Sequence, residues 1–366
     1  MAKPRFLSKS RFKTGCECPT KLFFTGKPEY GNNNVGNAFL AALAEGGFQV
    51  GELAKLYHHG GVGIETLDSE KAVKETSELL QSKSVTLYEP ALQTGNLLVR
   101  VDVLIKSGLS VQLIEVKAKS FDPTIENPFY NKTALKKGLR QISSDWEPYL
   151  LDIAYQTYVA RKAFPKWKVS SFLMLADKTA AASVDGLNQR FFLKKDDRGR
   201  SHVAVAPGVT PEDLGAPVLI KVDVNEAVDV IFKNKIEGRT FEEHVDFLAN
   251  AYAADQMIPP TVGGQCKSCE FRIDEVKKTK GLKSGFEKCW VDGEKLSADE
   301  LVQPHVFEIW NFRKTPKLIE DGRFFIKDVT EKDIEPRARE SESGLSSTER
   351  QWLQVQKIQT NDSSAY

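Results

Sequence analysis

Residues 96–120, NLLVRVDVLIKSGLSVQLIEVKAKS, constrain the fold more than any other part of the chain. Apolar residues occupy every second position on both sides of a polar turn at residues 107–110. This period-two alternation, rich in β-branched residues, predicts two strands that share one buried face. Gly108 and Leu109 fit a two-residue hairpin loop of type II′, in which glycine takes the first position.

That loop fixes which polar residues face each other across the hairpin. Asp102 is expected opposite Glu115, and Arg100 opposite Lys117. Opposed Cβ atoms lie about 4.5–5.5 Å apart, so two carboxylates in these positions repel each other. A divalent cation between the two carboxylates would turn this repulsion into a net attraction. Mg²⁺ prefers one or two carboxylate ligands together with water and phosphate oxygens. The alternative is an ordinary solvated strand face on which lysine balances the acids.

Composition limits the class of protein. The chain has 366 residues, is 41% hydrophobic and 28% charged, and carries a net charge of +1. Its length predicts two or three domains, and nucleic-acid binding would depend on locally clustered basic residues. No apolar run reaches about 18 residues, so no membrane partner is expected. The basic N-terminus lacks the apolar stretch of a signal peptide, so a cytoplasmic location is expected.

The five cysteines lie near the two ends of the chain. Cys266 and Cys269 form a C-x2-C motif, Cys289 follows, and Cys16 and Cys18 are N-terminal. A reduced chain with this pattern is typical of a metal site, and thiolates suit zinc or an iron–sulphur cluster. Four ligands need only one N-terminal cysteine, and Cys18, which precedes a proline, is the candidate. The alternative is that the cysteines are small buried apolar residues.

Helix and strand signals follow one another in the order of an α/β core. Helices are expected over residues 8–24, 36–57 with an interruption near Gly46, 67–82 with Asp68 as N-cap, and 149–164. Strands are expected over residues 84–92, in the hairpin described above, and over residues 169–177. We expect a mixed central sheet flanked by helices.

We expect five parts along the chain. These are an N-terminal helix with the first cluster cysteine (1–35), the core (36–177), an insertion (178–260), a cysteine region (261–292) and a C-terminal extension (293–366). Part of the extension is expected to be disordered, because its last residues are polar and poor in aromatics.

Taken together, the hairpin and the cysteines resemble the RecB-like branch of the PD-(D/E)XK nuclease superfamily. The resemblance is to members with a four-cysteine iron–sulphur clasp, such as the CRISPR-associated RecB-like exonuclease and AddB-type nuclease domains. It rests on segments that span roughly residues 7–290: LSKSRFKTGCECPTKLFF, VRVDVLI, LIEVKAKS, LLDIAYQTYV, and CKSCEFR with SGFEKCW.

The resemblance implies a restriction-endonuclease-like core, with an iron–sulphur clasp that joins the N- and C-terminal segments. It implies that Asp102, Glu115 and the carbonyl of Val116 bind Mg²⁺ or Mn²⁺, and that Lys117 assists the attacking water. It favours a [4Fe-4S] cluster over zinc. The implied cluster ligands are Cys18, Cys266, Cys269 and Cys289.

Two motifs depart from the pattern of these nucleases. Many of them have a histidine on the helix before the sheet, where this chain has Gly51, so the neighbouring Glu52 is a weaker candidate ligand. The Q-x3-Y motif keeps Gln156 but has Ala160 in place of tyrosine. The candidate nucleic-acid contacts are Gln156, Arg100 and Lys119.

The expected function is metal-dependent hydrolysis of DNA phosphodiester bonds by a deoxyribonuclease, in antiviral defence or DNA repair. The expected partners are single- or double-stranded DNA and a protein that supplies a further nuclease or helicase activity. The alternatives are a weakly active or inactive nuclease-fold subunit that binds DNA or assembles a complex, and a nuclease directed at RNA.

Overall fold

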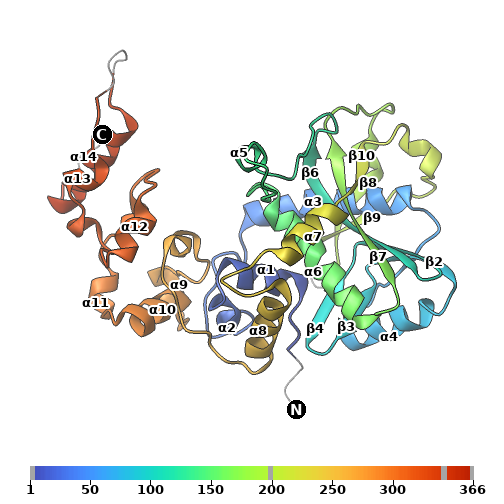
Figure 1. Cartoon of the computed structure of the whole chain (residues 1–366), viewed down its shortest axis with the longest axis horizontal. Helices are drawn as coiled ribbons and strands as arrows, with labels where there is room; N and C mark the ends of the chain where they lie inside the picture. Colours follow the sequence, from blue (N-terminus) through green and yellow to red (C-terminus); the bar gives the residue numbers. More distant parts are fainter. Residues whose placement is uncertain (1–4, 197–200, 339–343, 363–366) are drawn as a thin grey trace. The chain divides into compact units, whose positions relative to one another are not determined.

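The computed structural model describes residues 5–196, 201–338 and 344–362 (Figure 1). The chain divides into two units. Unit 1 consists of Met1–Cys16 and Gly36–Gln256, and unit 2 consists of Glu17–Val35 and Met257–Tyr366. Segments near the two ends of the chain thus belong to the same unit. None of the helices in the described residues is long and apolar enough to cross a membrane.

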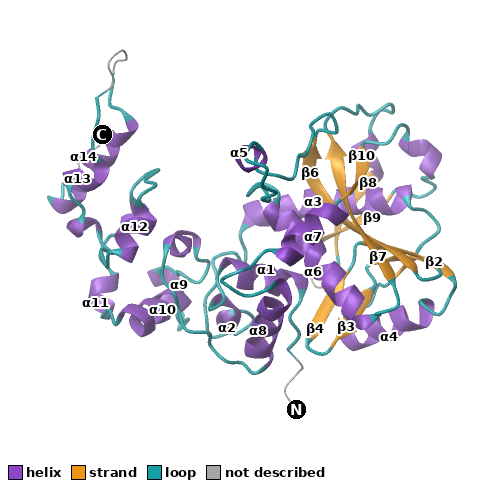
Figure 2. Cartoon of the chain, in the orientation of Figure 1, coloured by secondary structure: helices purple, strands orange, loops and turns teal. Residues whose placement is uncertain are grey.

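A six-stranded mixed sheet forms the centre of unit 1, in the order β1-β2-β5-β6-β7-β10. Figure 2 shows the strands of unit 1 in orange, with helices beside them. Its strands are β1 (Val62–Gly63), β2 (Ser84–Tyr88), β5 (Val103–Ser107), β6 (Ser110–Phe121), β7 (Lys168–Asp177) and β10 (Leu219–Asp223). The pairs β1–β2 and β6–β7 are parallel, and the others are antiparallel. The predicted α/β class with a mixed central sheet is confirmed.

Helices cover both faces of this sheet. Helix α3 (Ala38–Tyr57) packs on the face that carries Ile114 and Met174. Helix α6 (Glu147–Ala163) lies on the opposite face, where its Gln156 contacts Glu115. Because neighbouring residues of a strand point to opposite faces, Ile114 joins an apolar core while Glu115 points toward α6.

The structure confirms the predicted register of the β5–β6 hairpin. Ser107 pairs with Ser110, and Val103 pairs with Ile114. Gly108 has a φ of 61°, which the first position of a type II′ turn requires. Alternation and turn chemistry are both local signals, so they specify this register without help from the rest of the fold.

The strand before β5 does not continue as predicted. Residues Leu97–Arg100 form β4, which pairs with β3 (Ala91–Thr94) in a separate two-stranded sheet. Arg100 is therefore opposite Ala91, and its predicted pairing with Lys117 is wrong. The chain changes partner at Val101, whose N–H donates to the carbonyl of Pro90, so Asp102 lies at a strand break.

Two helix predictions need correction. The helix predicted over residues 8–24 is split into α1 (Lys9–Glu17) and α2 (Lys21–Phe24), because Pro19 disfavours helical backbone at Cys18. Helix α3 runs without a break through Gly46, at a cost of about 1 kcal/mol for that glycine. Asp68 caps α4 (Ser69–Leu79) as predicted.

The segment predicted as an insertion contributes to the main sheet. Its hairpin, β8 (Phe191–Lys195) and β9 (Ser201–Val205), forms a sheet of its own. Strand β10, however, pairs with β7, and residues as far as Gln256 belong to unit 1. The remaining elements of unit 1 are α5 (Lys132–Leu135), α7 (Asn225–Lys233), α8 (Phe241–Ala253) and the 3₁₀ turns Leu187–Arg190 and Pro211–Leu214.

Unit 2 is built from short helices around an apolar core that includes Trp290, Phe307 and Val355. Its helices after α2 are α9 (Glu275–Thr279), α10 (Gly285–Glu294), α11 (Ala298–Leu301), α12 (Thr315–Glu320), α13 (Glu331–Ile334) and α14 (Ser347–Gln359). Its 3₁₀ turns are Gly264–Ser268, Val306–Glu308 and Ile326–Asp328. Within the extension predicted to be partly disordered, α14 is helical, whereas residues 339–343 and 363–366 lie outside the described residues.

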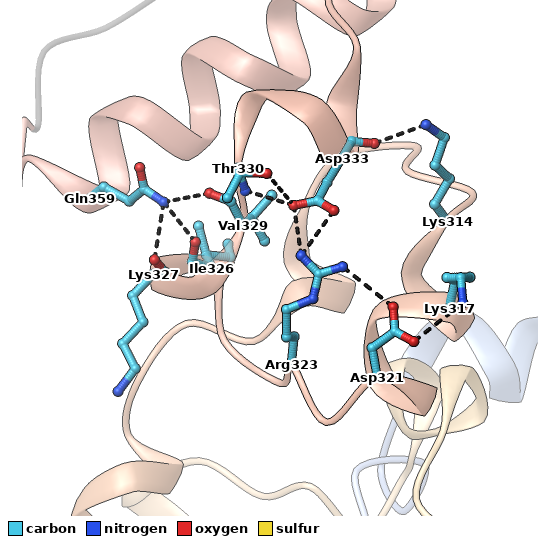
Figure 3. A network of polar contacts seen from close by, with 10 residues as sticks. All are labelled: Lys314, Lys317, Asp321, Arg323, Ile326, Lys327, Val329, Thr330, Asp333 and Gln359. Atoms are coloured by element: carbon cyan, nitrogen blue, oxygen red, sulfur yellow. Dashed lines mark hydrogen bonds and ion pairs between the residues drawn. The ribbon is translucent and has the colours of Figure 1, made fainter.

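Polar contacts fix the C-terminal elements of unit 2 to one another (Figure 3). The Arg323 guanidinium donates to both carboxylate oxygens of Asp333, at 2.9 and 2.8 Å. Asp333 also accepts the N–H and hydroxyl of Thr330. The Gln359 amide, at the end of α14, donates to three backbone carbonyls within residues 326–329.

His305 is fully buried in the core of unit 2. Its ring stacks on Phe307 with centroids 4.8 Å apart, and Trp290 packs against it. Burial, with a smaller contribution from the charge of Arg272, lowers the pKa of His305 to about 4. The folded protein thus disfavours the imidazolium that the unfolded chain forms below its ordinary pKa.

We predict that unit 2 loses stability as the pH falls from about 6.5 to 4, because the unfolded state binds a proton that the folded state does not. The loss from His305 reaches about 3 kcal/mol. Denaturant unfolding followed by tryptophan fluorescence at several pH values measures it. His305→Phe is expected to flatten the pH dependence, and an unchanged slope in that variant would contradict the assignment.

Candidate active site

Glu115 is a fully buried carboxylate in the middle of β6. It accepts hydrogen bonds from the ammonium groups of Lys9, at 2.6 and 2.8 Å, and of Lys117, at 2.6 Å. The amide of Gln156 donates to it at 2.6 Å. A buried carboxylate needs such partners, because desolvating an unpaired charge is very costly.

Asp102 approaches Glu115, as the hairpin register predicted. Its Oδ2 accepts the backbone N–H of Val116 at 2.6 Å, and its Oδ1 lies 3.8 Å from the Lys9 ammonium. Lys9 therefore bridges the two carboxylates. Lys9 was not predicted as a site residue, because its contact with Glu115 joins positions 106 residues apart.

The two carboxyl groups have opposite pKa shifts. Burial and the charge of Glu115 raise the pKa of Asp102 to about 7. Burial also disfavours the Glu115 carboxylate, but the charges of Lys9 and Lys117 outweigh it, so the pKa of Glu115 falls to about 2. For Lys9, burial lowers the pKa, yet the charges of Glu115 and Asp102 outweigh it and the pKa is raised. Lys9 is thus a permanent cation at this site.

Asp152 is a second residue that the sequence analysis missed. Its Oδ2 lies 3.0 Å from the Lys117 ammonium, and its side chain is nearly buried. Asp152 precedes Gln156 by four residues in α6, so one face of the helix presents both side chains to β6. This i, i+4 spacing in LLDIAYQ is the signal that could have identified it.

A cleft of about 850 Å³ opens above the carboxylate pair. Lys9, Asp102 and Lys117 line it, each with 24% of its side chain exposed. The lining residues Val116, Glu52 and Glu89 also belong to unit 1.

Of the weaker ligand candidates, the structure places Glu52 and Val116 in the cleft. The carboxylate of Glu52 pairs with Lys55 at 2.6 Å and thus already has a cationic partner. Glu89, which the sequence analysis did not identify, follows β2 in a left-handed conformation, with a φ of 54°. Burial raises the pKa of Glu89, which also senses the charge of Lys9.

The three candidate nucleic-acid contacts have different surroundings. Gln156 is fully buried against Glu115 and thus supports the carboxylate. Arg100 donates to backbone carbonyls of residues 64, 66 and 89, so its guanidinium stabilises the fold. The Lys119 ammonium lies over the rings of Trp146 and Tyr149, at 4.8 and 4.9 Å from their centroids. Among these three, Lys119 stays a prediction as a phosphate contact.

The predicted cluster ligands line one small cavity in unit 2. They are Cys18, Cys266, Cys269 and Cys289. Cys16 belongs to unit 1, where its Sγ lies 4.0 Å from Nε2 of His244. Burial raises the pKa of Cys266 to about 11, and it also raises the pKa of Cys269 and Cys289.

The cysteine cavity of unit 2 and the carboxylate pair of unit 1 offer different donor atoms to a metal. Four thiols around an almost apolar cavity suit an iron–sulphur cluster or zinc, whereas two carboxylates that share an ammonium suit a hard cation. As they stand, the described side chains include no group of three or more His, Cys, Asp or Glu residues that could hold a metal ion.

A scan against protein-family models finds no match to this chain, and a search of curated proteins finds no match either. The resemblance to PD-(D/E)XK nucleases therefore remains a prediction from the motifs and their spacing.

We predict that Cys18→Ser lowers the metal content of the protein and that Cys16→Ser leaves it at the parental level. Cys18 lines the cavity with the other three thiols, whereas Cys16 is beside His244. Elemental analysis and visible absorbance of anaerobically purified protein measure iron and zinc. Equal metal content in the two variants would contradict the assignment of Cys18.

Proposed function

We propose that this chain is a metal-dependent nuclease of the PD-(D/E)XK type that hydrolyses DNA phosphodiester bonds. The observation that carries the proposal is the group formed by Asp102, Glu115 and Lys117 at the cleft. Two carboxylates share one cation, and a second lysine is held on the buried carboxylate. This is the arrangement expected of a site that exchanges an ammonium for a divalent cation.

A purely structural role explains this group less well. Buried ion pairs add little net stability, because desolvation offsets much of their attraction. Three of the charged side chains also reach the cleft, each with 24% of its side chain exposed. Ionisable groups with strongly shifted pKa values in a cleft are typical of functional sites.

Asp102 and Glu115 would hold Mg²⁺ or Mn²⁺, and the carbonyl of Val116 is a further candidate ligand. When bound, such an ion polarises a phosphoryl oxygen and lowers the pKa of a coordinated water. The N–H of Val116 fixes the orientation of Asp102 through its bond to Oδ2. Gln156 holds Glu115 from the side of α6.

Lys117 acts in this proposal as a fixed cation. Burial lowers its pKa, but the charges of Glu115 and Asp152 outweigh burial and raise the pKa. Lys117 therefore stays protonated at neutral pH and does not serve as a base. It can donate to an attacking water or to a phosphoryl oxygen as negative charge develops there.

The proposal extends to the architecture and the setting of the chain. We assign unit 1 a restriction-endonuclease-like core of the RecB-like branch. We assign unit 2 a [4Fe-4S] clasp, with zinc as the other candidate. The occurrence of Glu17–Val35 and Met257–Tyr366 in one unit supports a clasp between the N- and C-terminal segments. A cytoplasmic location and a role in antiviral defence or DNA repair belong to the same proposal.

An inactive nuclease-fold subunit that binds DNA is the second candidate. Lys9 favours it, because its ammonium balances the carboxylate pair without any metal. The pairing of Glu52 with Lys55 favours it as well, since it leaves the cleft without a further uncompensated ligand from α3. Cleavage measurements separate the two candidates.

We predict that anaerobically purified protein cleaves labelled DNA with Mg²⁺ or Mn²⁺ and not with EDTA. Asp102→Ala and Lys117→Ala are expected to lower the rate by at least about a hundredfold, because Asp102 would hold the metal ion and Lys117 would donate to the attacking water or the reacting phosphate. Single- and double-stranded substrates are compared in gel assays.

Lys106→Ala is the matched control, because Lys106 is a lysine of the same hairpin that donates to the carbonyl of Ser82. Circular dichroism checks that each variant is folded. Absence of cleavage by the parent under all conditions would contradict the proposal and favour the DNA-binding subunit.

We predict that Asp152→Asn lowers the cleavage rate by about 10–100-fold, the usual effect of removing a residue that orients an active-site group. The amide keeps the shape of the side chain but removes a charge that keeps Lys117 protonated. Asp152→Glu, which keeps the charge, is expected to retain more of the rate than Asp152→Asn. An equal loss of rate in the two variants would indicate that Asp152 has a structural role only.

A further inference from the structure

We propose that Lys9 is a tethered counter-ion that occupies the divalent-cation position of the carboxylate pair and leaves it when the cation binds. Its ammonium lies 2.6 and 2.8 Å from the two oxygens of Glu115 and 3.8 Å from Asp102. This inference rests on the proposed metal site. It assigns a role to a residue outside the D…ExK motif.

The backbone of Lys9 is firmly placed. Phe12, in the same helix α1, is fully buried and stacks on Tyr155 with ring centroids 4.6 Å apart. The Tyr155 hydroxyl donates to the carbonyl of Leu7, just before the helix. Because α1 is anchored on both sides of Lys9, the flexible four-carbon side chain is the part that can move.

The two lysines on Glu115 are not equivalent. Lys117 pairs with Glu115 and with Asp152, and it forms no ion pair with Asp102 among the described residues. Lys9 lies between Glu115 and Asp102, the two groups that would bind the metal. A divalent cation at that place would repel Lys9 strongly at such short range. Lys9 is therefore the cation that is exchanged.

The cleft offers a place for the displaced ammonium. Glu89 lines the same cleft, where it feels the charges of Lys55, of Arg100 and, to a smaller extent, of Lys9. Glu65 lines it as well. Release of Lys9 toward these acids costs less than release into an apolar environment, because a carboxylate again compensates its charge. Without metal, Lys9 keeps the buried carboxylates neutralised and ordered.

Manganese binding without nucleic acid tests this exchange. Electron paramagnetic resonance of free Mn²⁺ gives the affinity of the parent and of Lys9→Met. The variant is expected to bind Mn²⁺ at least about tenfold more tightly, the ratio that corresponds to 1.4 kcal/mol. Lys9→Arg is expected to stay near the parent, because it keeps the competing charge. Lys106→Met, which removes a lysine of the neighbouring strand β5 that donates to the carbonyl of Ser82 and does not line the cleft, is the matched control.

A measurement on the parent protein avoids any problem of folding in the variants. An amine bridged by two carboxylates reacts slowly with acetic anhydride, and an amine released into the cleft reacts faster. Peptide mass spectrometry is therefore expected to show several-fold more acetylation of Lys9 with Mn²⁺ than with EDTA, relative to Lys106, which does not line the cleft. Acetylation of Lys9 that is unchanged or reduced by Mn²⁺ would overturn the proposal.

The outcomes separate this inference from the proposed nuclease function. If the parent binds Mn²⁺ but Lys9→Met binds it no more tightly, the role of Lys9 is overturned and the metal site stands. If neither protein binds Mn²⁺, both the role of Lys9 and the proposed metal site are overturned. If Lys9→Met binds Mn²⁺ more tightly and neither protein cleaves DNA, the exchange at Lys9 is supported and the nuclease activity is overturned.

Discussion

The burial of the Glu115 carboxylate in the central sheet is the constraint on which the site depends. A charge in that position is tolerated only with several donors, and these come from three elements: Lys9 of α1, Lys117 of β6 itself and Gln156 of α6. The same contacts therefore join α1 and α6 to the strand. They also leave Asp102 beside the buried charge, which makes the pair a site for a cation.

Local signals in the sequence were enough to predict the centre of this site. Alternation and a glycine turn gave the pairing of Val103 with Ile114, and that register brought Asp102 to Glu115. Asp68 as a helix cap was equally local. The pairing of Arg100 was wrong because the chain changes partner sheet at Val101, a choice that depends on β3 and Pro90 rather than on alternation.

The residues that complete the site could not be predicted so readily. Lys9 reaches Glu115 across 106 positions, and only the packing of α1 against Tyr155 brings it there. Asp152 had a usable signal in its spacing to Gln156, but its ionic partner lies on another element. For the cysteines, the sequence identified the group. The structure distinguishes Cys18, which lines the cavity of unit 2, from Cys16, which contacts His244.

The most direct test of the account is an anaerobic crystal structure of the parent protein with Mn²⁺, with anomalous data collected at the manganese edge. The account predicts one anomalous peak between Asp102 and Glu115, with carboxylate oxygens of both residues as ligands and the Lys9 ammonium turned away into the cleft. A structure with no peak there, and with Lys9 still bridging the two carboxylates, would contradict the central claim that this pair is a divalent-cation site.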